Sequence, residues 1–297
     1  MIHKISLGLD ALVAYLRKLK VDIYGAGHMV PLQRSHGTPE VVVSLTSYGR
    51  RVKTNVVYYT LISLLNQTYR PNRIILWLDR DNWNKENIPT KLKSLLPYGI
   101  EIHFCEDIRS YKKLIPTLHL CPDDIIITVD DDTMYNKVFV EELIKWHRDY
   151  PKCIVSSIGY VPVVDGRIIQ PYRQWTEIKK YRKGLSVFGV GVNGILYPPH
   201  SLHVDVLDIK RAMELAPIAD DIWFWIQSVR KGTHHLNIEI NYKNHSFDSL
   251  YQYFHRGTAL THTNNLECAN DKQLDALLNY YGIKEQIIEI INNERIQ

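Results

Sequence analysis

The sequence predicts an α/β protein with a mixed, mostly parallel sheet flanked by helices. Two observations lead to this fold class. Short apolar runs rich in β-branched residues alternate with longer segments of helical character, which is the pattern of βαβ units. Polar and acidic residues follow directly where several of these runs end, at the edge where open α/β sheets bind ligands. The predicted strands are residues 41–46, 73–79, 100–104, 125–129 and 153–158.

The composition is that of an ordinary soluble protein, with 297 residues, 45% hydrophobic and 23% charged. A net charge of +4 favours acidic ligands or anionic membrane surfaces, and no basic run suggests nucleic-acid binding. No apolar run is long enough to span a membrane. The cysteines are scattered and form no C-x-x-C pair, so we expect free thiols and a cytoplasmic protein. They are Cys105, Cys121, Cys153 and Cys268.

The first 39 residues are expected to form a helix and a linker. Residues 2–20 have apolar side chains at helical spacing, and the Gly- and Pro-containing residues 25–39 read as a loop. The stripe consists of Ile2, Ile5, Leu9, Leu12, Val13, Leu16 and Leu19. Such a helix either packs on the domain or makes peripheral contact with an anionic bilayer.

Three acids, Asp130, Asp131 and Asp132, follow the buried run at 125–129. If the backbone stays extended, Asp130 and Asp132 share one face and Asp131 lies on the other. Adjacent carboxylates repel, and a bound Mn²⁺ or Mg²⁺ would relieve that cost. The alternative is a solvated acidic turn that caps the next helix.

Cationic side chains stand at two further candidate positions. The loop at 46–51 follows the first strand and carries Arg50 and Arg51, whose planar guanidinium groups suit phosphate. Lys112 and Lys113 lie near the start of a helix expected to open at residue 110. In both places the alternative is a solvated basic surface.

The second half carries a Gly-rich stretch, an acidic pair and several histidines. Dense glycines at 187–199 either let the backbone approach a ligand closely or form a bulged strand pair. Asp220 and Asp221 open a helix, and an N-cap role explains one of the two acids, for which Asp220, the first of the pair, is the candidate. Two helices near 271–279 and 284–292 end the chain. The histidines of the tail are His245, His255 and His262.

Over residues 40–230 these stretches resemble the GT-A glycosyltransferases, in particular bacterial family-two-like enzymes. The first strand and its loop, the phrase at 63–71, and the acids at 79, 130–132 and 220–221 occur in the family's order. The resemblance implies a Rossmann-like catalytic domain at 40–265, with a nucleotide-binding half at about 40–135 and an acceptor half at about 136–265. Residues 266–297 would be C-terminal helices. The implied nucleotide-sugar-binding residues are Thr46, Ser47, Arg51, Asp79, Lys112, Asp130, Asp131 and Gly194.

The resemblance also implies a reaction. Asp132 and Asp130 would hold the metal, and a tail histidine, His262 or His255, would reach back to it. Asp221 would be the general base of an inverting transfer, with Asp220 beside it. The expected reaction moves a sugar from a UDP-sugar to a glycan or lipid-linked glycan of a bacterial surface polysaccharide. No arginine-rich acceptor motif follows residues 223–225, which favours single addition over polymerisation.

Three alternatives remain open. A retaining GT-A glycosyltransferase can show the same acids. A nucleotidyltransferase shares the scaffold and the metal, although the loop Thr-Ser-Tyr-Gly-Arg-Arg lacks the usual lysine. A sugar-binding module with structural Ca²⁺ suits the 19 tyrosines and 6 tryptophans, but it should show an all-β pattern.

Overall fold

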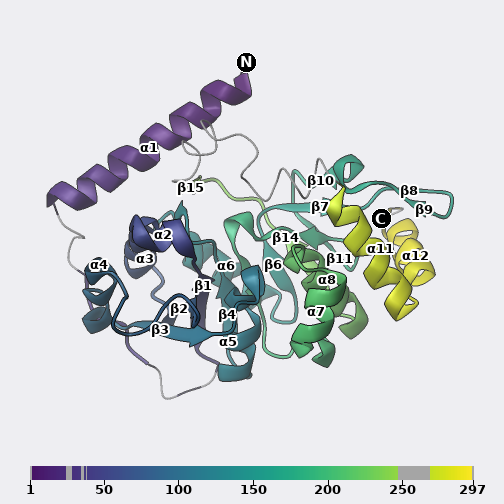
Figure 1. Ribbon diagram of the computed structural model, residues 1–297. Helices are drawn as coiled ribbons and strands as arrows, with labels where there is room; N and C mark the ends of the chain where they lie inside the picture. Colours follow the sequence, from purple (N-terminus) through teal and green to yellow (C-terminus); the bar gives the residue numbers. More distant parts are fainter. Residues whose placement is uncertain (1, 25–28, 35–36, 38, 247–267, 296–297) are drawn as a thin grey trace. The chain divides into compact units, whose positions relative to one another are not determined.

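The α/β class is confirmed by a computed structural model, which describes residues 2–24, 29–34, 37, 39–246 and 268–295 (Figure 1). The chain divides into two compact units. Unit 1 comprises Met1–Asp107, Lys112–Lys145 and Asn241–Thr258, and unit 2 comprises Ile108–Tyr111, Trp146–Ile240 and Ala259–Gln297. The predicted domain boundaries at 39/40 and 265/266 stay predictions.

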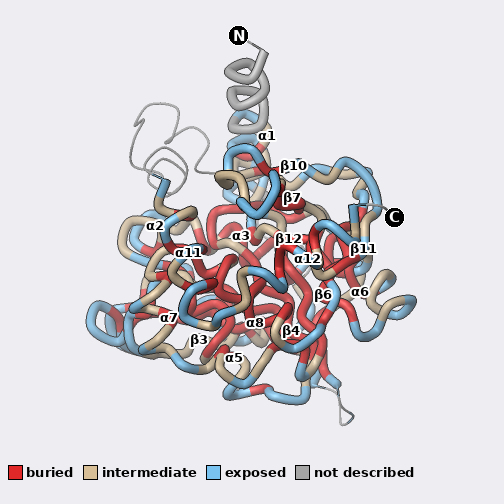
Figure 2. The backbone as a smooth tube through the Cα atoms, turned by 90° about the vertical axis from the view of Figure 1, so that its right-hand side faces the viewer, coloured by how far each residue is buried: buried red, intermediate tan, exposed pale blue. Residues whose placement is uncertain are grey.

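Unit 1 is built on a four-stranded parallel sheet in the order β4-β1-β2-β3. Its strands are β1 (Val41–Thr46), β2 (Arg73–Asp79), β3 (Ile100–Cys105) and β4 (Ile125–Thr128). Every residue of β2 and β4 is buried, as expected for a parallel sheet covered on both faces (Figure 2). The register places Val41 beside Ile125 and Val42 beside Arg73, so the carboxyl ends of β1, β2 and β4 share one edge.

Unit 1 also contains helices, which are labelled in Figure 1. They are α1 (Ile2–Tyr24), α2 (Gly49–Lys53), α3 (Val56–Leu65), α4 (Thr90–Lys93) and α5 (Ile115–Leu120). A short ladder pairs β5 (Thr133–Met134) with β15 (His245–Ser246). Helix α6 (Phe139–Asp149) runs across the boundary between the units.

Unit 2 contains a second group of strands and the C-terminal helices. The strands β11 (Arg182–Gly184), β14 (His235–Asn237), β6 (Ile154–Ser156) and β13 (Ile195–Tyr197) are neighbours in that order. The β14–β6 pair is parallel, and the other two pairs are antiparallel. A three-stranded sheet follows the order β10 (Thr176–Glu177), β7 (Gly159–Val161), β12 (Phe188–Gly189), and β8 (Val164–Asp165) pairs with β9 (Ile168–Ile169).

Helix α8 (Asp220–Lys231) forms the core of unit 2. Trp223 and Trp225 are fully buried, and their indole N–H groups donate to the carbonyl oxygens of Val206 and Leu185. The remaining helices are α7 (Ile209–Leu215), α11 (Ala269–Tyr281) and α12 (Lys284–Arg295). The two tryptophans therefore fix the helix that carries the Asp220–Asp221 pair.

Two predicted segments differ from the structure. The loop expected at 46–51 already enters helix α2 at Gly49, and Asn55, in a left-handed conformation with φ of 60°, separates α2 from α3. The helix expected to open at Ser110 is a 3₁₀ turn, Arg109–Lys113, and α5 begins only at Ile115. The four cysteines are free thiols, as predicted. Within the described residues no helix is long and apolar enough to cross a bilayer.

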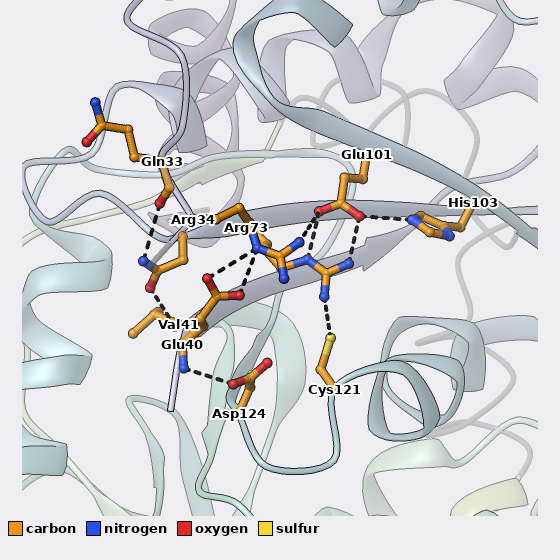
Figure 3. Close-up of polar contacts among 10 residues, drawn as sticks. Gln33, Arg34, Glu40, Val41, Arg73, Glu101, His103, Cys121 and Asp124 are labelled. Carbon is orange, nitrogen blue, oxygen red and sulfur yellow. Dashed lines mark hydrogen bonds and ion pairs between the residues drawn. The ribbon is translucent and has the colours of Figure 1, made fainter. Parts of the chain in front are cut away.

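The amino ends of the unit 1 strands carry their own ionic network (Figure 3). Arg73, at the start of β2, donates through two nitrogens to both carboxylate oxygens of Glu101 in β3, each at 2.7 Å. His103 contacts the same carboxylate at 3.0 Å. Burial opposes ionisation of Glu101, but Arg73 and His103 outweigh it and lower its pKa to about 2. This network joins neighbouring strands at the edge opposite the predicted ligand site.

Candidate functional site at the carboxyl edge of unit 1

The backbone between β1 and α2 and the backbone after β4 bring polar side chains together. Ser47 Oγ donates to one carboxylate oxygen of Asp131 at 2.5 Å, and Arg51 Nη1 contacts the other at 2.5 Å. Thr60 Oγ1, from α3, donates to the backbone carbonyl of Asp131 at 2.9 Å. Asp131 is thus held on three sides by side chains more than 70 residues away, and it is only 3% exposed. Burial raises its pKa, and Arg51 and Ser47 oppose that shift.

The expected alternation of the three acids is wrong. Strand β4 ends at Thr128, and the chain then turns, so the two-residue period no longer applies. Asp131 and Asp132 both contact Arg51, since Arg51 Nη2 lies 2.9 Å from Asp132 Oδ2. Asp130 lies instead 3.7 Å from Lys113 Nζ. Asp130 is therefore paired with a lysine, whereas Asp131 and Asp132 share one arginine.

The start of the C-terminal tail lies next to this cluster. Strand β15 pairs with β5, which places Ser246 opposite Thr133. Ser246 Oγ lies 3.5 Å from Asp132 Oδ2. His245 is buried and lies opposite Met134. His255 and His262, the predicted metal ligands of the tail, lie outside the described residues.

Thr46, Asp79 and Lys112 occupy neighbouring positions, and each makes a contact with the protein. Thr46 Oγ1 donates to the carbonyl of Trp77 at 3.0 Å. Asp79 accepts from the backbone and side-chain nitrogens of Asn82, at 2.9 and 2.6 Å, and so closes the turn after β2. Lys112 is buried and forms an ion pair with Asp107. Thr46 and Asp79 end two adjacent strands, as the sequence predicted.

The donor set at this edge has the chemistry of a site for a hard cation. Carboxylate oxygens suit Mg²⁺ and Mn²⁺, which usually take one or two protein carboxylates and complete their shell with water and phosphate. The Arg51 guanidinium already stands as a cation between Asp131 and Asp132. Among the residues that the structure describes, no three His, Cys, Asp or Glu side chains are gathered tightly enough to hold a metal ion by themselves. A metal at Asp130 and Asp132 therefore stays a prediction, and water and a ligand phosphate would have to complete its shell.

The second acidic pair belongs to unit 2. The prediction that Asp220 caps α8 is wrong: the N-cap is Ala219, and both acids lie in the first turn. Asp220 is 8% exposed, and Asp221 Oδ2 accepts a hydrogen bond from the backbone N–H of Gly191 at 3.0 Å. Burial raises the pKa of Tyr111, and the charges of these two acids raise it further.

The Gly-rich stretch contacts Asp221 through a backbone N–H group. Gly194 has φ of 83°, and its N–H donates to the carbonyl of Gly191 at 2.8 Å, closing a tight turn. That turn carries the N–H that reaches Asp221. The stretch contains β12, a 3₁₀ turn (Gly191–Asn193) and β13. Gly194 therefore serves the backbone conformation beside Asp221.

A row of buried polar groups in unit 2 had no signal in the sequence. Ser156 and Asn237 are register partners in β6 and β14, and His235 lies two residues before Asn237. His235 is buried, which lowers its pKa to about 3, and its Nε2 lies 2.8 Å from Ser228 Oγ. A Cβ on Gly189 would lie 2.8 Å from Ser156 Oγ and 3.3 Å from His235 Nδ1. A larger residue than glycine would therefore be too close to these side chains at position 189. The predicted close approach of the Gly-rich backbone is thus made, at this glycine, to side chains of the protein itself.

Comparisons with known proteins give little beyond the fold. No known family matches the sequence, and no curated protein matches it. Among solved structures, the chain is similar to CMP:2-keto-3-deoxy-manno-octonic acid synthetase complexed with CTP, at 15% identity and a TM-score of 0.41. The match covers 68% of this chain and 90% of the synthetase. At that level the likeness carries no argument about function.

Proposed function

We propose that this protein is a nucleotide-sugar-dependent glycosyltransferase that binds its donor at the carboxyl edge of the unit 1 sheet. One observation carries the proposal. Ser47 and Arg51 meet Asp131 and Asp132 at that edge, although the two pairs lie 80 or more residues apart in the sequence. Open α/β sheets bind ligands at such edges, and a diphosphate needs the cations that gather there. UDP is the nucleotide we expect, with Thr46, Ser47 and Asp79 lining its site.

The residues of this edge would share the work of binding a diphosphate. Arg51 and Lys113 supply positive charge, and Asp130 and Asp132 would hold Mn²⁺ or Mg²⁺. The metal, when bound, would stabilise the negative charge that develops on the leaving diphosphate. Ser47 and Thr60 keep Asp131 in place, and Asp131 in turn keeps the Arg51 guanidinium at the cluster. Lys112, held by Asp107, is a further candidate for a phosphate contact.

In unit 2 we propose Asp221 as the general base that takes the proton of the acceptor hydroxyl, with inversion at the anomeric centre. Its Oδ2 is oriented by the Gly191 N–H, which favours the carboxylate form. A base must be ionised before it can accept a proton. A retaining transfer would not need Asp221 in this role. The acceptor would be a glycan or a lipid-linked glycan of a bacterial surface polysaccharide.

A second candidate is nucleotidyl transfer, in which a nucleoside triphosphate and a sugar phosphate give a nucleotide sugar. Two cations at the acid cluster, Arg51 and Lys113, would also suit a triphosphate. The two reactions release different products. A glycosyltransferase releases nucleoside diphosphate from a nucleotide sugar, whereas a nucleotidyltransferase releases pyrophosphate.

Product analysis separates these candidates. The full chain is incubated with Mn²⁺ and either a panel of nucleotide sugars or a panel of nucleoside triphosphates with sugar phosphates. We expect slow release of UDP from a UDP-sugar, since many transferases lose their donor to water. Pyrophosphate release would replace the first proposal with the second. Binding of sugars without either product would favour the sugar-binding module.

Asp221→Asn tests the base. We expect turnover to fall by about 10²–10⁴-fold while donor binding stays near that of the wild type, because a positioned base acts on the acceptor. Asp220→Asn is the matched control, one residue away in the same helical turn. If Asp221→Asn transfers sugar at the wild-type rate, the base assignment is wrong. The anomeric configuration of the product, read by NMR, then tells whether transfer is retaining.

A peripheral membrane contact through residues 2–20 is a separate proposal, and it depends on α1 alone.

A further inference from the structure

Helix α1 carries exposed apolar side chains on one face, whereas Val13 and Leu19 of the predicted stripe are half-buried. Leu12, Leu16 and Ile23 lie four and seven residues apart and therefore on one face of the helix. They are 50%, 55% and 68% exposed, and Tyr15 beside them is 53% exposed. An amphipathic helix that belongs to a protein core does the opposite, because its apolar face is the one it buries.

The opposite side of α1 makes the contacts with unit 1. Ala14 is 1% exposed. Asp22 accepts a hydrogen bond from Tyr59 Oη at 2.6 Å and lies 3.1 Å from Lys91 Nζ. Lys18 lies over the ring of Tyr59, 5.4 Å from its centre. Small and charged side chains thus take part in attaching the helix, whereas Leu12, Leu16 and Ile23 stay exposed.

The charges of the helix favour an anionic partner. Residues 2–24 contain four lysines and arginines against two aspartates. One of those aspartates, Asp22, is already compensated by Lys91 on the side that faces unit 1. Lys20 is exposed at the border of the stripe. A long helix with an apolar face and basic residues along its border is the pattern of helices that lie in a membrane interface.

We infer that α1 lies in the plane of an anionic lipid surface, with Leu12, Leu16 and Ile23 among the acyl chains. Lys20 contacts lipid phosphate at the border, where long basic side chains keep their charge in water. The helix lies on the bilayer and does not cross it, in keeping with the length and composition of the helices that the structure describes. This inference is independent of the proposed transfer reaction.

Co-sedimentation of the full chain with vesicles tests it. We expect binding to vesicles of phosphatidylglycerol mixed with phosphatidylcholine, and much weaker binding to phosphatidylcholine alone. Leu16→Glu should lower vesicle affinity by at least about tenfold, since a buried leucine gives roughly 1.5–3 kcal/mol. Lys20→Glu should cost more than about fivefold, the effect of one basic residue near such a surface.

Val204→Glu is the matched control, because Val204 is a 72% exposed apolar residue that belongs to unit 2 and not to α1. It should leave vesicle binding unchanged, and circular dichroism should show that each variant is folded. Two results would overturn the inference: no binding of the wild type to anionic vesicles, or equal losses in Leu16→Glu and Val204→Glu. Light scattering that shows a dimer, dissociated by Leu16→Glu, would assign the stripe to a second copy of the chain.

Discussion

The two ends of the unit 1 sheet carry ionic networks of different character. At the amino ends, Arg73 and Glu101 satisfy each other with two parallel hydrogen bonds (Figure 3). At the carboxyl ends, three consecutive acids share Arg51 and Lys113. An arginine and a carboxylate that already pair with each other have little charge left to interact with a ligand. A cluster with more carboxylates than cations attracts a further cation. We propose from this comparison that the amino end serves stability and the carboxyl end serves binding.

Glu101→Gln should have the largest effect on stability. The substitution leaves the Arg73 guanidinium, whose side chain is 8% exposed, without its carboxylate partner. We expect a loss of about 3 kcal/mol, the lower end for breaking a buried pair, because Glu101 is 27% exposed. Urea unfolding measures it. The affinity for nucleotide should not change. A loss of nucleotide affinity in this variant would contradict the proposal that the two ends of the strands have separate roles.

Lowering the pH should weaken the stabilisation that the Arg73–Glu101 pair provides. The folded state lowers the pKa of Glu101 to about 2, whereas the unfolded chain has the ordinary value near 4.5. The stabilisation is complete above about pH 4.5 and is lost as the pH falls toward 2, by at most about 1.4 kcal/mol per pH unit. The difference in unfolding free energy between wild type and Glu101→Gln should therefore shrink between pH 5 and pH 3. A difference that stays constant would show that Arg73 does not set this pKa.

Asp130→Asn should have the smallest effect on stability. Its carboxylate is 31% exposed and lies 3.7 Å from Lys113, so the pair contributes about 0–1 kcal/mol. Urea unfolding should place this variant within that range of the wild type. A loss as large as that of Glu101→Gln would mean that the acids after β4 are structural, and the contrast between the two ends would fail.

Local patterns were enough to predict much of the sheet. The β-branched runs at 41–46 and 73–79 became β1 and β2 with the predicted bounds, because buried parallel strands need continuous apolar sequence. The three acids after β4 could also be identified as a cluster, because they are consecutive in the sequence and follow a buried strand. The pairing of Ser47 and Arg51 with Asp131 could not, since it joins residues 80 or more apart through the tertiary fold.

The missed features share one physical cause, which is that packing decides them. The stripe of α1 was identified by its spacing, but spacing does not tell which way the stripe faces. Asp220 was expected as a cap because aspartate is common there, yet it is the first residue of α8 and the cap position is occupied by Ala219. The buried row of Ser156, His235 and Asn237 belongs to no motif, and it forms only where β6 and β14 pair.

Calorimetric titration of UDP in the presence of Mn²⁺, with wild type, Asp132→Asn and Glu101→Gln, tests the central claim most directly. Asp132 lies at the carboxyl ends of the unit 1 strands, where we propose that the donor binds, and Glu101 lies near their amino ends. The account predicts that Mn²⁺ strengthens UDP binding to wild type and to Glu101→Gln, and that Asp132→Asn loses this gain while remaining folded. Undiminished Mn²⁺-dependent binding by Asp132→Asn would contradict it.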